Sequence, residues 1–219
     1  STLTIGAVDS LNQCFLFGLY NRILDAKPPF CLNLKTYGNL ILYSQMANNI
    51  VDVAFTVEHI RNKETKTQVL FREPMVLVCR PGQYHSGPIH PHELDSGNEV
   101  AIHWDMREMQ LWHDQWFSPN AKTYVTLNAP SFAPHFFRQA AVWAIMPISA
   151  GLYFQQEHGM EIHEMHFPPP RRICYMLTPR HPRADRIEHM EFFNRHLDDY
   201  LNQMDWLERE PQSEQEEED

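Results

Sequence analysis

The chain has 219 residues, of which 43% are hydrophobic and 21% are charged, and its formal net charge is −10. This length fits one large domain or two small ones, and the acidic balance argues against nucleic-acid binding by these residues, because nucleic acids are bound by basic faces. No apolar run approaches ~20 residues and the N-terminus lacks the features of a signal peptide, so we expect no membrane contact.

The first 56 residues predict alternating strands and helices. A short buried strand is expected over 3–7, and a helix begins at Ser10, where Ser10 and Gln13 form a capping-box pattern. The next expected elements are a strand over 31–36, a helix over 37–50 and a strand over 51–56. This β-α-β-α-β order predicts a parallel sheet with right-handed crossovers.

A second α/β block follows a stretch rich in Pro, Gly and His over 81–98. Two strand-like runs, 67–73 and 74–80, lead into that stretch. The block itself predicts strands over 98–104, 122–128, 142–147, 160–167 and 171–177, with helices over 106–117, 129–140 and 148–158. An amphipathic helix over about 183–207 ends the fold, and the acidic segment 208–219 is expected to be a disordered tail.

The four cysteines are Cys14, Cys31, Cys79 and Cys174. None forms a C-x-x-C pair, and each lies in an apolar run, where a free thiol behaves as a small hydrophobic side chain. Free thiols indicate a reducing compartment, so we expect a cytoplasmic protein. Redox sensing by Cys14 is a minor alternative.

The candidate binding residues follow the ends of the predicted strands. Ligands of open α/β sheets gather there, close to helix N-termini whose backbone N–H groups lack partners. The candidates are Asp9, Ser10, Leu11, Tyr37, Asn39, Thr56 and Val57 in the first block, and Trp104, Asn128, Ala129, Pro147 and Ser149 in the second. The alternative for Ser10, Asn39 and Ser149 is a role as helix N-caps, worth roughly 1 kcal/mol without any ligand.

Four motifs, in this order, resemble the effector-binding domain of LysR-type transcriptional regulators. They are "LTIGAVDSL", "NNIVDVAFT", "VLFREPMVLVCRPG" and "AAVWAIMPISAG". The resemblance covers about residues 1–205. The family's N-terminal winged helix-turn-helix has no counterpart in these residues, so promoter DNA would be bound only through that missing domain.

The resemblance implies an α/β fold of two Rossmann-like subdomains with a ligand cleft between them, as in type 2 periplasmic binding proteins. The first subdomain would comprise residues 1–80 and 179–207, and the second residues 81–178. Ser10 matches the family's ligand-contacting serine and Asn39 matches a Ser/Thr-type position of the same pocket. Asn128 and Ser149 resemble positions on the opposite wall.

The implied function is the sensing of a small-molecule effector that biases DNA binding through a shift between two states. A solute-binding protein for a transporter and, less favoured, an enzyme on the same scaffold are the alternatives. Asp9 would repel a carboxylate. An anion site would use an arginine, and the nearest arginines, Arg61, Arg107 and Arg138, do not stand at strand ends. Both observations favour a neutral or zwitterionic effector.

We expect neither a catalytic residue set nor a metal or cofactor. The histidines of "IHPH" (89–92) and "HEMH" (163–166) do not complete a tetrahedral ligand set. The family resemblance implies a homodimer or tetramer. The helices at 15–25 and 131–140 are the candidate contacts, the latter because it carries Phe132, Phe136 and Phe137. Core packing is the alternative for these three side chains.

Overall fold

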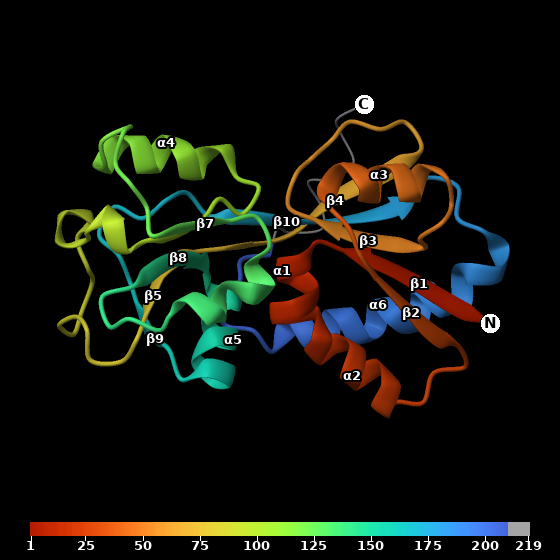
Figure 1. Cartoon of the computed structure of the whole chain (residues 1–219). Coiled ribbons are helices and arrows are strands. Elements are labelled where there is room, and N and C mark those ends of the chain that lie inside the picture. Colours follow the sequence, from red (N-terminus) through yellow and green to blue (C-terminus); the bar gives the residue numbers. More distant parts are fainter. Residues whose placement is uncertain (210–219) are drawn as a thin grey trace. The chain divides into compact units, whose positions relative to one another are not determined.

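A computed structural model of the chain describes residues 1–209 and divides into two compact units (Figure 1). Unit 1 contains Ser1–Arg72 and the chain from Ile173 onward, and unit 2 is Glu73–Arg172. The subdomain limits expected from the sequence, after residues 80 and 178, lie several residues further along the chain than these two boundaries. Met75–Cys79, which was expected in the first subdomain, therefore belongs to unit 2. The expected limits stay a prediction.

Unit 1 is built on a five-stranded sheet with the order β2-β1-β3-β10-β4. Its strands are β1 (Thr2–Ala7), β2 (Cys31–Thr36), β3 (Val53–Thr56), β4 (Thr65–Glu73) and β10 (Arg172–Pro179). β1 pairs in parallel with both β2 and β3, whereas β10 runs antiparallel to β3. The parallel arrangement predicted for the first three strands is therefore confirmed.

The helices of unit 1 bury an apolar stripe against this sheet. α1 (Asp9–Leu11) continues through the π-helical segment η1 (Asn12–Leu16) into α2 (Phe17–Asp25). This stripe consists of Leu11, Phe15, Leu19 and Ile23, all of which are buried in the core. The other helices are α3 (Asn39–Ala47), the 3-10 turn η5 (Ala184–Arg186) and α6 (Ile187–Asn202), which is shorter than expected.

The observed N-caps lie one or two residues before the predicted ones, so the proposed capping residues are wrong. The N-cap residues are Val8, Gly38 and Pro147, each with an extended backbone. An N-cap residue has non-helical, extended φ and ψ angles, and the residue just before each of these helices already has them. Ser10, Asn39 and Ser149 consequently lie inside the first helical turn, and the predicted Ser10–Gln13 capping box is not the helix start.

Unit 2 contains a three-stranded antiparallel sheet and a parallel strand pair. The sheet has the order β8-β5-β9, and the pair is β6-β7. The strands are β5 (Met75–Cys79), β6 (Val100–Ile102), β7 (Val125–Leu127), β8 (Trp143–Pro147) and β9 (Glu161–His163), and the helices are α4 (Arg107–Trp116), α5 (Ile148–His158) and the 3-10 turns η2 (Pro91–Glu93), η3 (Ser96–Asn98) and η4 (Pro130–Phe136).

The helix expected over 129–140 is instead the 3-10 segment η4. Pro134 has no N–H group to donate to the carbonyl four residues earlier, so an α-helical ladder is interrupted in its first turn. Of the three phenylalanines expected at the surface, Phe137 is buried and Phe132 is exposed.

The cysteines differ in environment. Cys14, Cys79 and Cys174 are buried, whereas Cys31 is exposed on the edge strand β2, and all four are free thiols. The prediction of four apolar sites is thus wrong for Cys31. Burial raises the pKa of the Cys79 thiol to about 12, which keeps it protonated and weakly reactive.

The acidic tail predicted over 208–219 lies, from residue 210 onward, outside the described residues. Glu208 exchanges two backbone hydrogen bonds with Arg72 at the end of β4.

Within residues 1–209, no helix combines the length and apolar character that crossing a bilayer requires.

Gly6 on β1 has no room for a side chain. An added Cβ would lie 2.6 Å from Leu42 Cδ2 and 3.3 Å from Val51 Cγ1. We expect Gly6→Ala to lower the free energy of unfolding by about 1–3 kcal/mol because it overpacks the core. Urea unfolding would measure the loss.

The control for this substitution is Gly38→Ala. Gly38 has a negative φ and nothing within 4 Å of its added Cβ. Its replacement should cost less than ~1 kcal/mol, since only the N-cap preference changes. Equal losses in the two variants would contradict the steric explanation.

His113 on α4 pairs with Glu99, just before β6, through a 2.6 Å contact between Nε2 and Oε2. Both side chains are shielded, with 15% and 4% exposure. The hydrogen bond that His113 donates to the Glu99 carboxylate raises the pKa of His113 above its ordinary value. The pair fastens α4 to the parallel strands of unit 2.

The raised pKa of His113 predicts a pH dependence of stability. The contribution is fully present below the unfolded pKa of about 6.5 and is lost as pH rises through the folded pKa. Between pH 6 and pH 9 the wild type should lose roughly 1–3 kcal/mol more than His113→Gln, whose side chain does not titrate. Urea titrations at both pH values test this, and parallel losses would refute it.

Candidate functional site

Three strands of unit 1 end side by side. The register pairs Ala7 at the end of β1 with Thr36 on β2 and with Phe55 on β3. Two backbone hydrogen bonds connect the segments that follow: Tyr37 N–H donates to Ala7 O over 3.2 Å, and Val8 N–H donates to Phe55 O over 3.3 Å. The structure thus brings the candidate residues of the first block to one edge of the sheet.

These candidates differ in accessibility. Asp9 and Tyr37 are partly exposed, and the others are buried: Ser10, Leu11, Asn39, Thr56 and Val57. Leu11 belongs to the apolar core, so its position at the edge is explained by packing. Asp9 and Tyr37 therefore present partly accessible polar groups, and the buried polar side chains of Ser10, Asn39 and Thr56 lie at the same edge.

Asn39 joins the start of α3 to the end of β3. Its Oδ1 accepts a buried hydrogen bond of 2.9 Å from Val57 N–H. The neighbouring Thr56 hydroxyl donates to Glu58 O over 3.2 Å. Asn39 thus fixes the loop after β3, a role that the capping interpretation did not foresee.

Asn12 was missed as a candidate. Its Nδ2 donates to Lys35 O over 3.1 Å and to Thr36 Oγ1 over 2.9 Å, while its Oδ1 accepts from Tyr20 OH over 2.6 Å. These bonds tie the π-helical segment η1 to the end of β2. π-helical turns are frequent at functional sites.

The strand ends of unit 2 also converge. β6 and β7 are parallel, with Ile102 opposite Leu127, and a parallel bridge between Glu99 and Trp143 places β8 beside β6. The residues that follow these ends are Trp104, Asn128, Ala129, Pro147 and Ser149. Asn128 is exposed and Ala129 is partly exposed, whereas the other three are buried.

Trp104 adopts a strained backbone at the end of β6. Trp104 and Asp105 both have a left-handed φ, 55° and 54°, a conformation that costs of order 1–3 kcal/mol per non-glycine residue. Trp104 Nε1 donates to Ile145 O over 2.8 Å, and the Arg172 guanidinium lies 5.7 Å from the ring centroid. The Trp104 indole thus makes internal contacts through its N–H group and through one face of its ring.

Ser149 binds a carboxylate of the chain itself. Its backbone N–H and its hydroxyl both donate to Glu73 Oε1, over 2.9 and 2.6 Å. Arg172 donates to Glu73 Oε2 over 3.2 Å. Sequence reasoning missed Glu73 and Arg172, although the charged pairs at 72–73, inside "VLFREPMVLV", and at 171–172, at the start of "RRICYML", were a signal.

The Glu73 carboxylate sits at the N-terminus of α5. There the helix dipole favours negative charge, and burial of a charge is tolerated because it is paired and hydrogen-bonded. Relative exposure is 0% for Glu73, 1% for Arg172 and 3% for Ser149. The three residues form a closed network, named here the Glu73 network.

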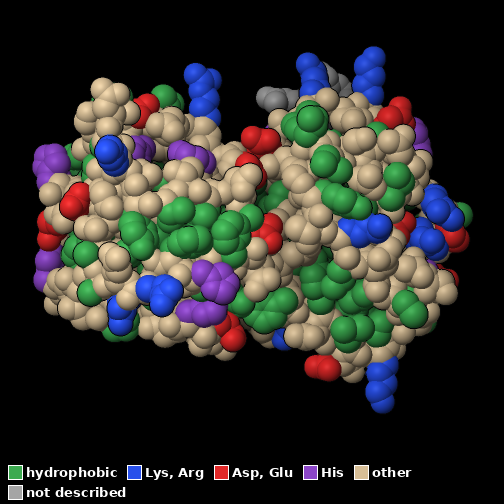
Figure 2. Space-filling view, in the orientation of Figure 1, with side chains coloured by type: hydrophobic (Ala, Val, Ile, Leu, Met, Phe, Trp, Pro, Cys, Tyr) green, Lys and Arg blue, Asp and Glu red, His purple; other side chains and the backbone are tan. Residues whose placement is uncertain are grey.

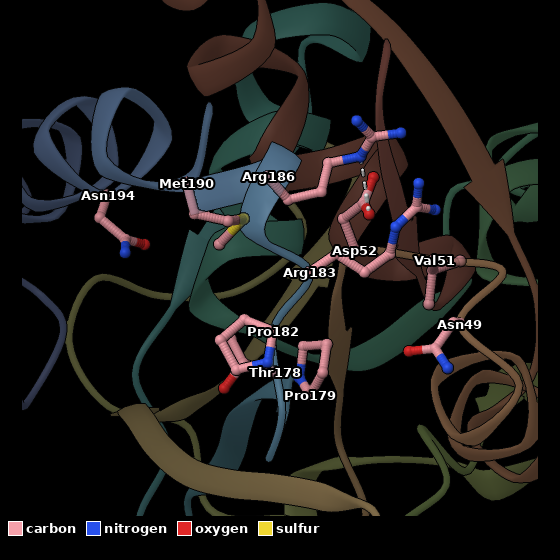
Figure 3. A pocket seen from close by; sticks show the side chains of 10 residues that line it. All are labelled: Asn49, Val51, Asp52, Thr178, Pro179, Pro182, Arg183, Arg186, Met190 and Asn194. Carbon is pink, nitrogen blue, oxygen red and sulfur yellow. Dashed lines mark hydrogen bonds and ion pairs between the residues drawn. The ribbon is translucent and has the colours of Figure 1, made fainter. Parts of the chain in front are cut away.

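A separate pocket of unit 1 lies at the opposite end of β3 (Figure 3). Asp52 precedes β3 and pairs with Arg186 over 3.2 Å, while its other oxygen accepts from Thr4 N–H over 2.8 Å. The pocket encloses about 190 Å³, below the ~300 Å³ typical of small-molecule sites. None of the predicted residues lines it.

No three His, Cys, Asp or Glu side chains within residues 1–209 gather in a set that could hold a metal ion. His163 of "HEMH" contacts Glu161 over 2.6 Å, while His166 is exposed. His90 and His92 of "IHPH" have ring centroids 4.8 Å apart, and His92 N–H donates to His90 Nδ1.

A model of the LysR substrate binding domain family matches residues 1–196. Among solved structures, the reduced form of the OxyR regulatory domain from Pseudomonas aeruginosa is 15% identical, with a TM-score of 0.70 over 93% of this chain and 96% of that one. The regulatory domain of MexT from Pseudomonas aeruginosa, a transcriptional activator, is 12% identical, with a TM-score of 0.75 over 91% and 100%.

Full-length BenM E226K is 14% identical, with a TM-score of 0.67, and the match covers 92% of this chain and 69% of that one. At these identities, the likeness shows the fold. The comparison with curated proteins found no match.

The buried bond of Asn39 predicts a stability loss. Asn39→Ala leaves Val57 N–H without its acceptor, at a cost of about 1–3 kcal/mol in the free energy of unfolding. Asn33→Ala is the control, because Asn33 is exposed on β2 and its loss should stay within ~0.5 kcal/mol. Denaturant unfolding of both variants distinguishes them, and similar midpoints would show that the Asn39 bond contributes little.

Proposed function

The chain belongs to the LysR substrate-binding domain family, the effector-sensing part of LysR-type transcriptional regulators, and we propose that it binds its effector at the carboxyl edges of its parallel strands. The fold expected of this family, two Rossmann-like α/β subdomains of the type 2 periplasmic-binding-protein kind, is confirmed. The observation that carries the proposal is the convergence of three strand ends in each unit.

The residues assigned to effector contact are those that combine polar chemistry with this position. In unit 1 they are Asp9, Ser10 and Tyr37, which follow the ends of β1 and β2. In unit 2, Asn128 follows β7 and is exposed, and the partly exposed Ala129 beside it offers only its backbone polar groups. Asn39, Thr56 and Ser149 hold nearby segments through hydrogen bonds, which are buried for Asn39 and Ser149 and partly buried for Thr56.

Binding of the effector would shift the populations of two conformations, which requires different affinities for the two. Promoter DNA would be contacted by a segment outside these residues, in a cytoplasmic regulator. The family membership favours this role over that of a solute-binding protein for a transporter, and it points to a regulatory domain rather than an enzyme.

A homodimer or tetramer is part of the same proposal. Hydrophobic side chains reach the surface of both units (Figure 2). Large exposed ones on the two segments that we assign to subunit contact are Phe17 and Leu24 on α2 and Phe132 on η4. Phe137, expected at the same surface, instead packs against Phe154 in the core, with ring centroids 6.1 Å apart.

A thermal-shift screen against metabolites tests the proposed function. A true effector should raise the unfolding midpoint of the wild type. Ser10→Ala and Asn128→Ala should each weaken its binding about tenfold or more, which corresponds to ~1.4 kcal/mol or more.

Ser44→Ala, an exposed serine on α3, is the matched control and should bind the effector as the wild type does. An effector whose affinity changes in neither Ser10→Ala nor Asn128→Ala would refute the proposed site.

A further inference from the structure

We infer that the pocket of unit 1 beside Asp52 is a second ligand site, which takes a small organic acid whose apolar body is about the size of one ring. Residues before β3 and at the end of β10 line this pocket, whereas the proposed effector edge lies at the other end of β3. The second site therefore goes beyond the proposed function and does not depend on it.

The apolar part of the pocket fits a small hydrocarbon group. Its walls include Val51, Pro179, Pro182 and Met190 (Figure 3). An apolar cavity of about 150 Å³ is enough to hold a benzene ring, and this pocket encloses about 190 Å³. The pocket therefore has room for one ring or one branched chain.

Two arginines and an aspartate supply charged groups to the pocket. Figure 3 shows the side chains of Arg183 and Arg186 extending toward the Asp52 carboxylate. One oxygen of Asp52 accepts from Arg186 Nε and the other accepts from Thr4 N–H, and the side chain is only 13% exposed. Asp52 thus holds Arg186 in place and is largely shielded from a ligand, which argues against a cationic occupant.

Arg183 is the group that would bind the acid. Its Nη2 donates to Asp185 over 3.0 Å, and both side chains of this pair are 53% exposed. Exposed ion pairs contribute little, because water competes for both charges. A guanidinium has five N–H donors in a planar fork. A ligand carboxylate that lies against the apolar wall of the pocket can therefore bind beside Asp185 or replace it.

The surroundings of the pocket attract anions although the whole chain is acidic. The segment 180–186 contains three arginines and one aspartate. Arg180 N–H donates to Glu64 O over 3.1 Å, so the segment 61–66, which contains three basic residues and one glutamate, lies beside it. The two segments carry a net charge of +4, whereas the chain carries −10. Such a local positive potential concentrates anions near the pocket.

The test uses cyclohexanecarboxylate as the ligand and the methyl resonance of Met190 as the readout, at an ionic strength kept constant with sodium chloride. The resonance should shift in a saturable way, with a dissociation constant of about 1–10 mM for a ligand of this size. Cyclohexanecarboxamide, which is neutral, and acetate, which lacks the ring, should each bind about tenfold more weakly or worse.

Three variants show whether the acid binds Arg183. Arg183→Gln should weaken binding about tenfold or more, because it removes the charged fork. Asp185→Asn should instead strengthen binding about two- to fivefold, since the internal competitor for Arg183 is lost. Arg61→Gln removes an exposed charge outside the pocket. It is the matched control and should change the affinity less than about twofold, because salt screens distant charges.

Several outcomes would overturn the inference. One is the lack of a saturable Met190 shift up to ~50 mM ligand, well above the expected dissociation constant. Another is an equal loss of affinity in Arg183→Gln and Arg61→Gln, which would show attraction by general charge. A loss in Ser10→Ala without one in Arg183→Gln would place the acid at the effector edge, and would leave the proposed function standing. An effector indifferent to both Ser10→Ala and Asn128→Ala would refute the effector edge and leave the second site standing.

Discussion

The buried ion pair between Glu73 and Arg172 holds the two ends of unit 2 together. Glu73 is the first residue of the unit and Arg172 is the last, and the two side chains meet at 3.2 Å. Desolvating two charges costs several kcal/mol per ion unless geometry and further hydrogen bonds offset it. Here Ser149 supplies the further hydrogen bonds. The Glu73 network therefore joins the last residue of β4 and the first residue of β10 to the start of α5.

The same network explains why a strained turn persists at the end of β6. The left-handed backbone of Trp104 and Asp105 requires support from its surroundings. The Trp104 ring has that support, because Arg172 covers it and Ile145 O accepts its N–H. The end of β6 in unit 2 is therefore organised around internal partners, whereas the edge of unit 1 keeps partly exposed polar groups at Asp9 and Tyr37.

Local patterns predicted the fold well and the site only in part. The alternation of strands and helices over the first 56 residues was correct because side-chain periodicity and strand order are local properties. The predicted helix caps were wrong by one or two residues, because Val8, Gly38 and Pro147, whose backbones are extended, occupy the N-cap positions. The pairing of Glu73 with Arg172 spans 99 residues, and no local pattern specifies such a partner.

The π-helical segment Asn12–Leu16 has a further consequence for the corner where β1 meets α1. A π-turn contains about one residue more than an α-turn, so it acts as a one-residue insertion that advances the helix by about 100°. Asp9 and Ser10 therefore lie at a different angle around the helix axis, relative to the buried stripe of α2, than they would in an uninterrupted α-helix. An otherwise similar chain that lacked one residue of this segment would keep the same α2 core and turn a different side of α1 toward the proposed effector-binding edge.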